Sequence, residues 1–359
     1  MSVRMLPRTS ARSLLLALLV LNGVTVSTLY WAQAVASTVR LEFGPSVWAS
    51  LMPSATLAGY AIGVALLAGL ARDLTTANGL GLHALLLGVG LGTAAVAPAV
   101  PLIALDCVLI GIGCSLTQRL LACATSAVSS RARGPVIGGV IASGLIGIVA
   151  ARALVPVASA AVGWRTMFML DAGLICTCGI VAAIAALRVD RHAWESDAAP
   201  LPSCWTLWHR QPVLRRAALQ QAVVFASFNL GWAIFPRIVA ASDGFTSSPM
   251  GIIASLGACA ALGAGWACKK YPAARIANVG LCSVLLAGAS AMVASGAGPI
   301  LYAAMTLLDM GTQTALVANQ ARGQASATTP AMRGRLAAIV TTMGFSAGAI
   351  GAAIGNALL

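Results

Sequence analysis

Charged residues are scarce in this chain. Aspartate, glutamate, lysine and arginine make up 9% of its 359 residues, whereas a soluble domain contains about 25%. Instead, apolar runs of 20 or more residues recur along the whole length, each long enough to cross the roughly 30 Å hydrocarbon layer of a bilayer. In lipid, backbone amides have to be satisfied within their own segment, so these runs are predicted to be helices. The composition excludes an ordinary soluble domain and predicts an all-α, multi-pass membrane protein.

Patterns typical of catalysis and of cofactor binding are also missing. The nine cysteines lie almost entirely in apolar spans, and the one-residue spacing of Cys176 and Cys178 fits neither a zinc site nor a redox pair. There is no nucleophile–histidine arrangement and no Gly-x-x-x-x-Gly-Lys-[Ser/Thr] phosphate loop. We therefore predict no enzyme, no metal and no cofactor. The net charge of +13 does not indicate nucleic-acid binding, because the basic residues are spread through short loops.

The distribution of basic residues predicts the orientation. The hydrophobic windows predict eleven spans, at 13–36, 47–70, 79–98, 100–127, 135–161, 166–187, 214–240, 248–267, 275–295, 297–318 and 333–358. With the N-terminus in the cytoplasm, 17 of the 22 lysines and arginines fall on the cytoplasmic side, whereas Arg40, Arg165 and Arg237 fall outside. This asymmetry follows the positive-inside rule. We expect a bacterial inner-membrane protein surrounded by lipid, with a cytoplasmic N-terminus.

A long polar stretch divides the chain into two halves. Residues 188–212 are predicted to be a cytoplasmic linker between an N-terminal bundle of six helices, 1–187, and a C-terminal bundle of about five, 213–359. The halves repeat each other at an offset of 200 residues, and the matched positions are Gly111 and Gly311, Arg133-Gly134 and Arg333-Gly334, and Gly144 and Gly344. Two pseudo-symmetric halves around a midplane site are typical of secondary transporters.

Short segments in both halves carry a family resemblance. In chain order they are Leu29-Tyr30-Trp31-Ala32-Gln33, Gly59-Tyr60-Ala61-Ile62-Gly63, Ser143-Gly144-Leu145-Ile146-Gly147, Ala151-Arg152, Gly163-Trp164-Arg165, Pro212-Val213-Leu214-Arg215-Arg216, Leu308-Asp309-Met310-Gly311, Asn319-Gln320 and Arg333-Gly334-Arg335. In this order they resemble a bacterial branch of the major facilitator superfamily. The resemblance implies that family's two-bundle fold and a proton-linked exporter or uptake system for small molecules.

Two departures from the family pattern leave a second function open. The gating loop between the second and third helices usually reads Gly-x-x-x-Asp-Arg, but here Arg72-Asp73 carries the two charges in exchanged order. A typical member has twelve helices, so eleven spans imply that the twelfth is absent or that the chain is a truncated transporter. The alternative is a non-transporting protein of the same fold that acts as a sensor or a partner subunit.

Five ionisable residues fall within the predicted spans, namely Asp106, Arg119, Arg152, Asp171 and Asp309. Each costs about 2.5–3.5 kcal/mol on insertion scales, so each one needs a structural or functional reason. Asp106, Arg152 and Asp171 share a similar depth on consecutive spans, which predicts a buried group of ion pairs. Asp309 lies near the midplane with no basic residue at its depth in the second half, which indicates a proton or substrate site or a polar helix contact.

These positions define the predicted site. The proton-coupling candidates are Asp309, Asp106 and Arg152, and the substrate-cavity candidates are Tyr30, Gln33, Gln118, Arg119, Asn229, Trp232, Gln313 and Gln320. Core packing remains an alternative for the wall residues of the first and seventh spans, and snorkelling remains one for Arg119. The preferred function is a monomeric secondary transporter that moves a small organic solute by alternating access. We expect it to be coupled to protons and directed outward, as in efflux of a drug or metabolite.

Overall fold

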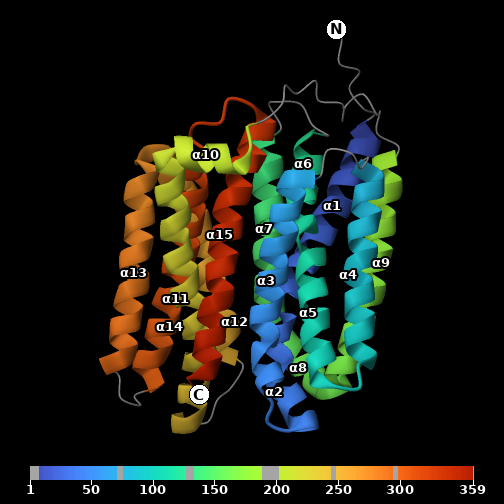
Figure 1. Cartoon of the computed structure of the whole chain (residues 1–359), viewed down its shortest axis with the longest axis vertical. Coiled ribbons are helices and arrows are strands. Elements are labelled where there is room, and N and C mark those ends of the chain that lie inside the picture. Colours follow the sequence, from blue (N-terminus) through green and yellow to red (C-terminus); the bar gives the residue numbers. More distant parts are fainter. Residues whose placement is uncertain are drawn as a thin grey trace.

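The chain folds into long, nearly parallel helices. The computed structural model describes residues 8–70, 76–126, 133–187, 202–243, 248–293 and 298–358, which contain helices and no strands. The helices are α1 (Arg8–Leu29), α2 (Trp31–Phe43), α3 (Val47–Leu70), α4 (Thr76–Val96), α5 (Val100–Cys114), α6 (Leu116–Ser126), α7 (Arg133–Ala153), α8 (Val155–Val162), α9 (Trp164–Leu187), α10 (Cys204–Arg210), α11 (Pro212–Asp243), α12 (Ser248–Lys270), α13 (Ala273–Val293), α14 (Gly298–Gly323) and α15 (Pro330–Ala357). Figure 1 shows two groups side by side, α1–α9 and α11–α15, with α10 lying across one end.

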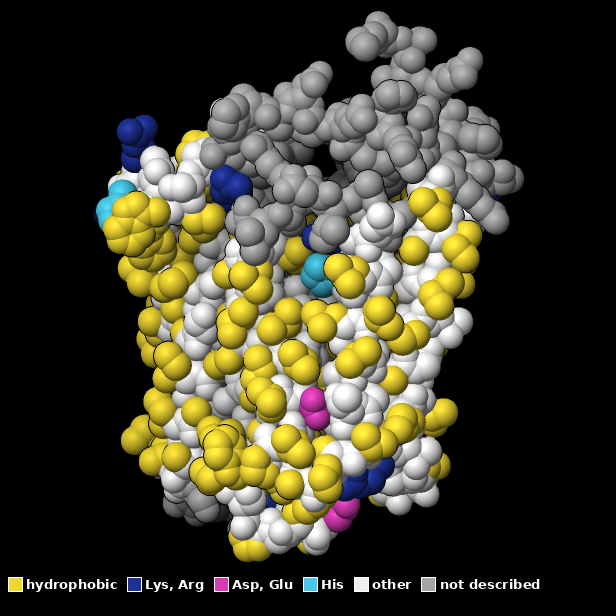
Figure 2. Space-filling model, turned by 45° about the vertical axis from the view of Figure 1, so that its right-hand side comes forward, with side chains coloured by type: hydrophobic (Ala, Val, Ile, Leu, Met, Phe, Trp, Pro, Cys, Tyr) yellow, Lys and Arg dark blue, Asp and Glu magenta, His cyan; other side chains and the backbone are white. Residues whose placement is uncertain are grey.

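The helices follow the predicted spans. Within the described residues, nine helices are long and apolar enough to cross a membrane, and the bent pair α7–α8 makes a tenth. α12, of 23 residues, covers the predicted eighth span. Figure 2 shows hydrophobic side chains over the long side of the molecule, as a lipid-facing surface requires. The prediction of an all-α, multi-pass membrane protein is confirmed.

Three predicted spans are interrupted. The first divides at Tyr30, the fourth at Ser115 and the fifth at Leu154, where α7 and α8 meet at 47°. The last bend has a local cause, because Pro156 has no backbone N–H and the carbonyl of Arg152 loses the partner that an unbroken helix would give it. The bend therefore begins beside Arg152, which is predicted from the sequence to lie within a membrane span.

The internal repeat reappears in the packing of small residues. Gly144 of α7 lies against Asn22 of α1, and Gly344 of α15 lies against Gln221 of α11. A glycine in a membrane helix lets the neighbouring backbone approach closely. The corresponding glycines of the two halves therefore sit at corresponding helix pairs.

The two halves meet where α3 packs against α15 and where α7 packs against α12. The rings of Tyr60 on α3 and Phe345 on α15 have centroids 4.4 Å apart. Near the end that carries α10, Nη2 of Arg335 donates to the carbonyl oxygen of Ala68 on α3 at 3.0 Å. The contact between the halves thus includes both apolar and polar pairs.

Candidate functional site

A buried ion pair connects the two halves. Nη1 of Arg152, on α7, donates to Oδ1 of Asp309, on α14, at 2.9 Å, and the two side chains are 7% and 1% exposed. Such a pair adds little net stability, because the cost of desolvation offsets the attraction, whereas removal of one partner costs about 3–5 kcal/mol. Each of the two buried charges is therefore compensated by a residue of the other half of the molecule.

The expected grouping of Asp106, Arg152 and Asp171 is wrong. Asp106 on α5 accepts a hydrogen bond from Thr93 of α4 at 2.9 Å, and buried Asp171 on α9 accepts one from Thr28 of α1 at 2.7 Å. Neither carboxylate forms an ion pair within the described ranges. A similar predicted depth does not determine which helix each residue faces, because successive helical residues turn by about 100°.

Three aromatic rings surround the guanidinium of Arg152. Its Cζ lies 3.9 Å from the ring centroid of Trp232, 5.4 Å from that of Phe228 and 5.5 Å from that of Tyr30. Phe228 and Trp232 are one turn apart on α11 and so share a face. The faces of aromatic rings attract cations, by about 2 kcal/mol or more where water is excluded. The rings stabilise the charge of Arg152 without occupying its N–H groups.

Several buried polar atoms around the pair have no hydrogen-bond partner in the part of the chain that the structure describes. They are Nε and Nη2 of Arg152 and Oδ2 of Asp309, and the indole N–H of Trp232 faces the same Asp309 carboxylate. Buried polar groups are nearly always satisfied by protein, ligand or water. The two unsatisfied N–H groups of buried Arg152 can therefore donate to a polar ligand.

A glycine makes room for the carboxylate of Asp309. Gly257 of α12 lies so close to Oδ2 that a methyl group in its place would overlap that oxygen, and Gln313 lies beside the same glycine. The predicted candidates Asp309, Arg152, Tyr30, Trp232 and Gln313 are thus brought together. We name them, with Phe228, the Arg152–Asp309 cage.

Gln118 belongs to a second polar group. Its Nε2 donates to Oη of Tyr60 at 3.1 Å, and that hydroxyl also hydrogen-bonds to Oγ1 of Thr117 at 3.0 Å. Since the ring of Tyr60 contacts Phe345 of α15, Gln118 lies close to the contact between the halves. Arg119 instead turns toward α4, where its guanidinium fills the space beside Gly79.

The remaining candidates lie elsewhere in the bundle. Buried Asn229 donates to the carbonyl oxygen of Phe225 in its own helix at 2.9 Å. Nε2 of Gln320 donates to Oγ1 of Thr341 at 2.8 Å and so joins α14 to α15. Gln33 is half-buried on α2. The predicted gating loop, Arg72-Asp73, lies outside the described residues.

Some residues of the site were not predicted. Phe228 precedes the candidate Trp232 by four residues, so helical spacing could have identified it as a second wall residue. Phe345 offers no such signal, because its contact with Tyr60 exists only once α15 packs against α3. The residue pattern of a single helix does not predict which residues of the other half it contacts.

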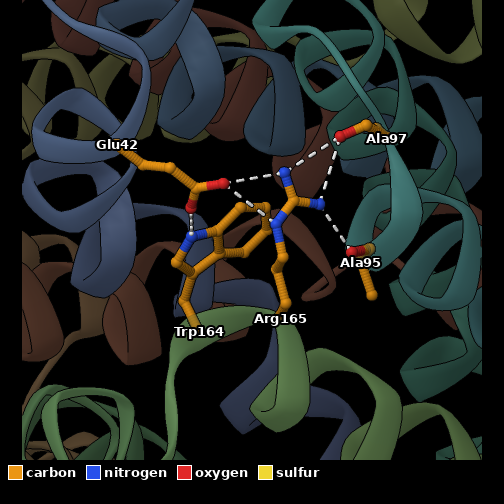
Figure 3. Close-up of polar contacts among 5 residues, drawn as sticks. All are labelled: Glu42, Ala95, Ala97, Trp164 and Arg165. Atoms are coloured by element: carbon orange, nitrogen blue, oxygen red, sulfur yellow. Dashed lines mark hydrogen bonds and ion pairs between the residues drawn. The ribbon is translucent and has the colours of Figure 1, made fainter.

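A separate network involves α2, which lies at the end of the bundle opposite α10 (Figure 1), and Figure 3 shows its contacts. Glu42 accepts hydrogen bonds from Nε1 of Trp164 at 2.6 Å and from Nε and Nη2 of Arg165 at 3.1 and 2.9 Å. Nη1 of Arg165 also donates to the carbonyl oxygens of Ala95 and Ala97 at 2.7 and 3.1 Å. The network joins the ends of α2, α4 and α9, so the Gly163-Trp164-Arg165 segment has a structural explanation.

Comparison with known proteins gives a family and several relatives. The family model described as Major Facilitator Superfamily matches residues 7–352. The uncharacterized transporter YgaY of Escherichia coli O157:H7 is 24% identical over 230 residues, which are 64% of this chain and 58% of that protein. The "Probable transporter SCO4007" of Streptomyces coelicolor is 26% identical over 224 residues, 61% of this chain and 51% of that protein. The matched part of the chain thus spans between half and two thirds of the length of these relatives.

Solved structures share the arrangement of helices. An inward-facing, unoccupied bacterial homolog of the human lysosomal transporter Spinster gives a TM-score of 0.74 at 16% identity, covering 96% of this chain and 82% of the other. The xylose transporter XylE from Escherichia coli, partially occluded and inward open, gives 0.69 at 13% identity, covering 97% and 92%. At these identities the likeness shows a common fold.

Proposed function

The chain belongs to the Major Facilitator Superfamily, and on that premise we propose that it is a secondary transporter that moves a small organic solute by alternating access. The relatives named as transporters support this proposal and an activity that is not enzymatic. The observation that carries it is the Arg152–Asp309 ion pair, which joins the halves at a buried site where polar atoms have no partner among the described residues.

The ion pair gives alternating access a physical basis. In this kind of transporter, one half rocks against the other around a midplane site. Movement of α7 away from α14 would separate Arg152 from Asp309 and leave two buried charges without partners, which is costly. The movement therefore needs a replacement partner, and a solute or a proton supplies one. On this proposal, loading of the site controls the change of state.

We propose that Asp309 couples transport to protons, because binding of a proton to its carboxylate removes the attraction for Arg152. Asp106 is a weaker candidate, since it hydrogen-bonds to Thr93 at a partly exposed position. The proposed direction is export, in keeping with the exporters that the sequence resembles. Conversion of Asp309 to asparagine would keep the shape of the side chain and remove the titrating group.

A cytoplasmic N-terminus in a bacterial inner membrane completes the proposal. The end of the bundle that carries α10 contains, among other basic residues, Arg210, Arg215, Lys269 and Arg322. Basic residues in short loops favour the cytoplasmic side of a membrane. The solute would then leave the cell through the end that contains the Glu42–Arg165 network.

The test uses purified protein in liposomes and a panel of small organic solutes. Wild-type protein is expected to transport at least one of them, at a rate that changes several-fold when a pH gradient is imposed. Asp309→Asn is expected to lose the dependence on the gradient, while Asp106→Asn retains it. Wild-type flux that ignores the gradient would refute proton coupling, and an absence of flux for every solute would refute transport.

A further inference from the structure

We propose that the transported solute is an organic carboxylate with an apolar, ring-sized body, and that it binds in the Arg152–Asp309 cage together with one proton. The inference rests on the proposed function and adds the substrate class. It comes from the hydrogen-bonding atoms that the cage leaves free. Among the described residues, two of these are donors on Arg152, and one is an oxygen of a carboxylate that already has a cationic partner.

The free edge of Arg152 matches a carboxylate. Asp309 occupies Nη1, while Nε and Nη2 have no partner among the described residues. Nε and Nη2 point the same way along one edge of the planar guanidinium, so a carboxylate can accept from both in parallel. The indole N–H of Trp232, whose ring stacks 3.9 Å from Cζ of Arg152, faces the carboxylate of Asp309 and is a third donor at the site. An acceptor-only group satisfies the two free donors of Arg152 and can share the third with Asp309.

A cationic solute fits the cage less well. It would have to bind Oδ2 of Asp309, the free oxygen of a carboxylate whose other oxygen already accepts from Arg152. A second positive charge would then lie beside the guanidinium at a site where both side chains of the pair are at least nine-tenths buried. Two like charges repel strongly at such a site, because little water is present to screen them. The free donors of Arg152 would also stay unsatisfied.

The walls of the cage suit an apolar body. Tyr30, Phe228 and Trp232 present rings within 5.5 Å of Cζ of Arg152, from the α1–α2 joint and from α11. Small-molecule sites commonly combine apolar and aromatic walls with a few placed polar groups that fix orientation. An acid with its carboxylate on the arginine edge would place its apolar body next to these rings.

A proton is expected to accompany the carboxylate. Once the acid is bound, two carboxylates share one guanidinium, which leaves a net negative charge in a water-poor site. Asp309 has a free oxygen, Oδ2, to receive a proton that restores neutrality. The ionisable groups that face it are Arg152 from α7 and the phenol of Tyr30, with Tyr60 of α3 beside Tyr30, whereas α11 and α12 contribute Trp232 and Gly257. Phenols are neutral at physiological pH, so Asp309 is the proton acceptor.

Joint binding has a consequence for direction. A proton and a carboxylate that enter together leave together, so the pair crosses the membrane as a neutral acid. Export then runs down the combined gradient of acid and proton, so the cell has to produce enough of the acid to outweigh an opposing proton gradient. The class of reaction that supplies the solute is one that releases an aromatic or other apolar carboxylic acid in the cytoplasm.

The experiment measures binding to the full chain in lipid nanodiscs by isothermal titration calorimetry. The acids are benzoate, phenylacetate and 3-phenylpropionate, and the shape-matched cations are benzylamine and phenethylamine. Titration in two carboxylate-free buffers of different ionisation enthalpy gives the number of protons taken up per acid bound. We expect at least one acid to bind with uptake of about one proton, and neither amine to bind. Binding of an amine but no acid, or of none of the five probes, would overturn the proposal.

Four variants assign the effect to the cage. Arg152→Lys keeps the charge but loses the two-donor edge, and Trp232→Phe keeps a ring but loses the N–H, so each is expected to weaken acid binding about 10-fold or more. Asp309→Asn is expected to bind the acid without proton uptake. Arg165→Lys changes an arginine that also pairs with a carboxylate, but in the Figure 3 network, and should bind as wild type does. If Arg152→Lys does not fold, Trp232→Phe and Asp309→Asn still test the proposal.

The outcomes separate this inference from the proposed function. If the liposome assay finds proton-dependent flux of a cation or a neutral solute but no acid, transport stands and the carboxylate proposal fails. If the acids bind with proton uptake but no solute moves, the site stands and transport fails. Unchanged affinity in both Arg152→Lys and Trp232→Phe would refute the cage as the binding site.

Discussion

At the scale of single residues, the proposed site depends on the surroundings of one carboxylate, that of Asp309. Asp309 has a cation on one side, a glycine on the other and an oxygen with no partner among the described residues. Sequence alone indicated that Asp309 was exceptional, because a charge near the midplane of an apolar helix needs a reason. It could not identify the partner, since Arg152 lies 157 positions away and meets Asp309 only when the halves pack.

Gly257 offers a test of how tightly Asp309 is held. In Gly257→Ala, the new methyl group would overlap Oδ2 of Asp309, so the carboxylate has to leave its present position. Overpacking of a buried site costs about 1–3 kcal/mol. Gly263→Ala in the same helix is the matched control, because a methyl group there meets no atom within 4 Å. Unfolding in mixed detergent micelles should show a lower stability for Gly257→Ala alone, and equal stabilities would contradict the packing described.

At the scale of helices, apolar length was predictable and interruptions were not. A window of hydrophobic residues determines where a helix can lie in lipid, and the eleven predicted spans all coincide with helices. Ser115 and Pro156 interrupt two spans but change the mean hydropathy of those spans little. Hydropathy averaged over a window therefore does not predict these interruptions. A proline four residues after Arg152 was nevertheless a usable signal for a bend.

The Figure 3 network makes a prediction at this scale. In Arg165→Ala, Glu42 loses its cationic partner and the carbonyl oxygens of Ala95 and Ala97 lose their donor, so the ends of α2, α4 and α9 should loosen. The ion pair itself is about a third exposed and contributes about 0–1 kcal/mol, so the free carbonyls account for most of the effect. Hydrogen exchange should quicken in the last turn of α4 and stay unchanged in α14. If the amides of α4 exchange at the same rate in the wild-type protein and in Arg165→Ala, the network does not stabilise this end of the bundle.

At the scale of the whole molecule, the internal repeat and the family resemblance predicted two related halves, and the family is confirmed. The contact between the halves was beyond prediction, because α3 meets α15 and α7 meets α12 through side chains that no single-helix pattern relates. The substrate class likewise depends on the free edge of Arg152, which only the three-dimensional arrangement reveals. A sequence can nominate charges inside a membrane, but the fold decides which of them pair.

The central claim is that the Arg152–Asp309 pair holds the halves together and that protonation of Asp309 releases them. Spin labels at Val157 on α8 and Ile300 on α14, both exposed, report the separation of the halves near the end opposite α10. The measurement is the label-to-label distance distribution, by pulsed electron resonance in nanodiscs with the native cysteines replaced. The account predicts a longer distance in Asp309→Asn, which mimics the protonated state, than in the wild-type background. Identical distributions in the two proteins would contradict it.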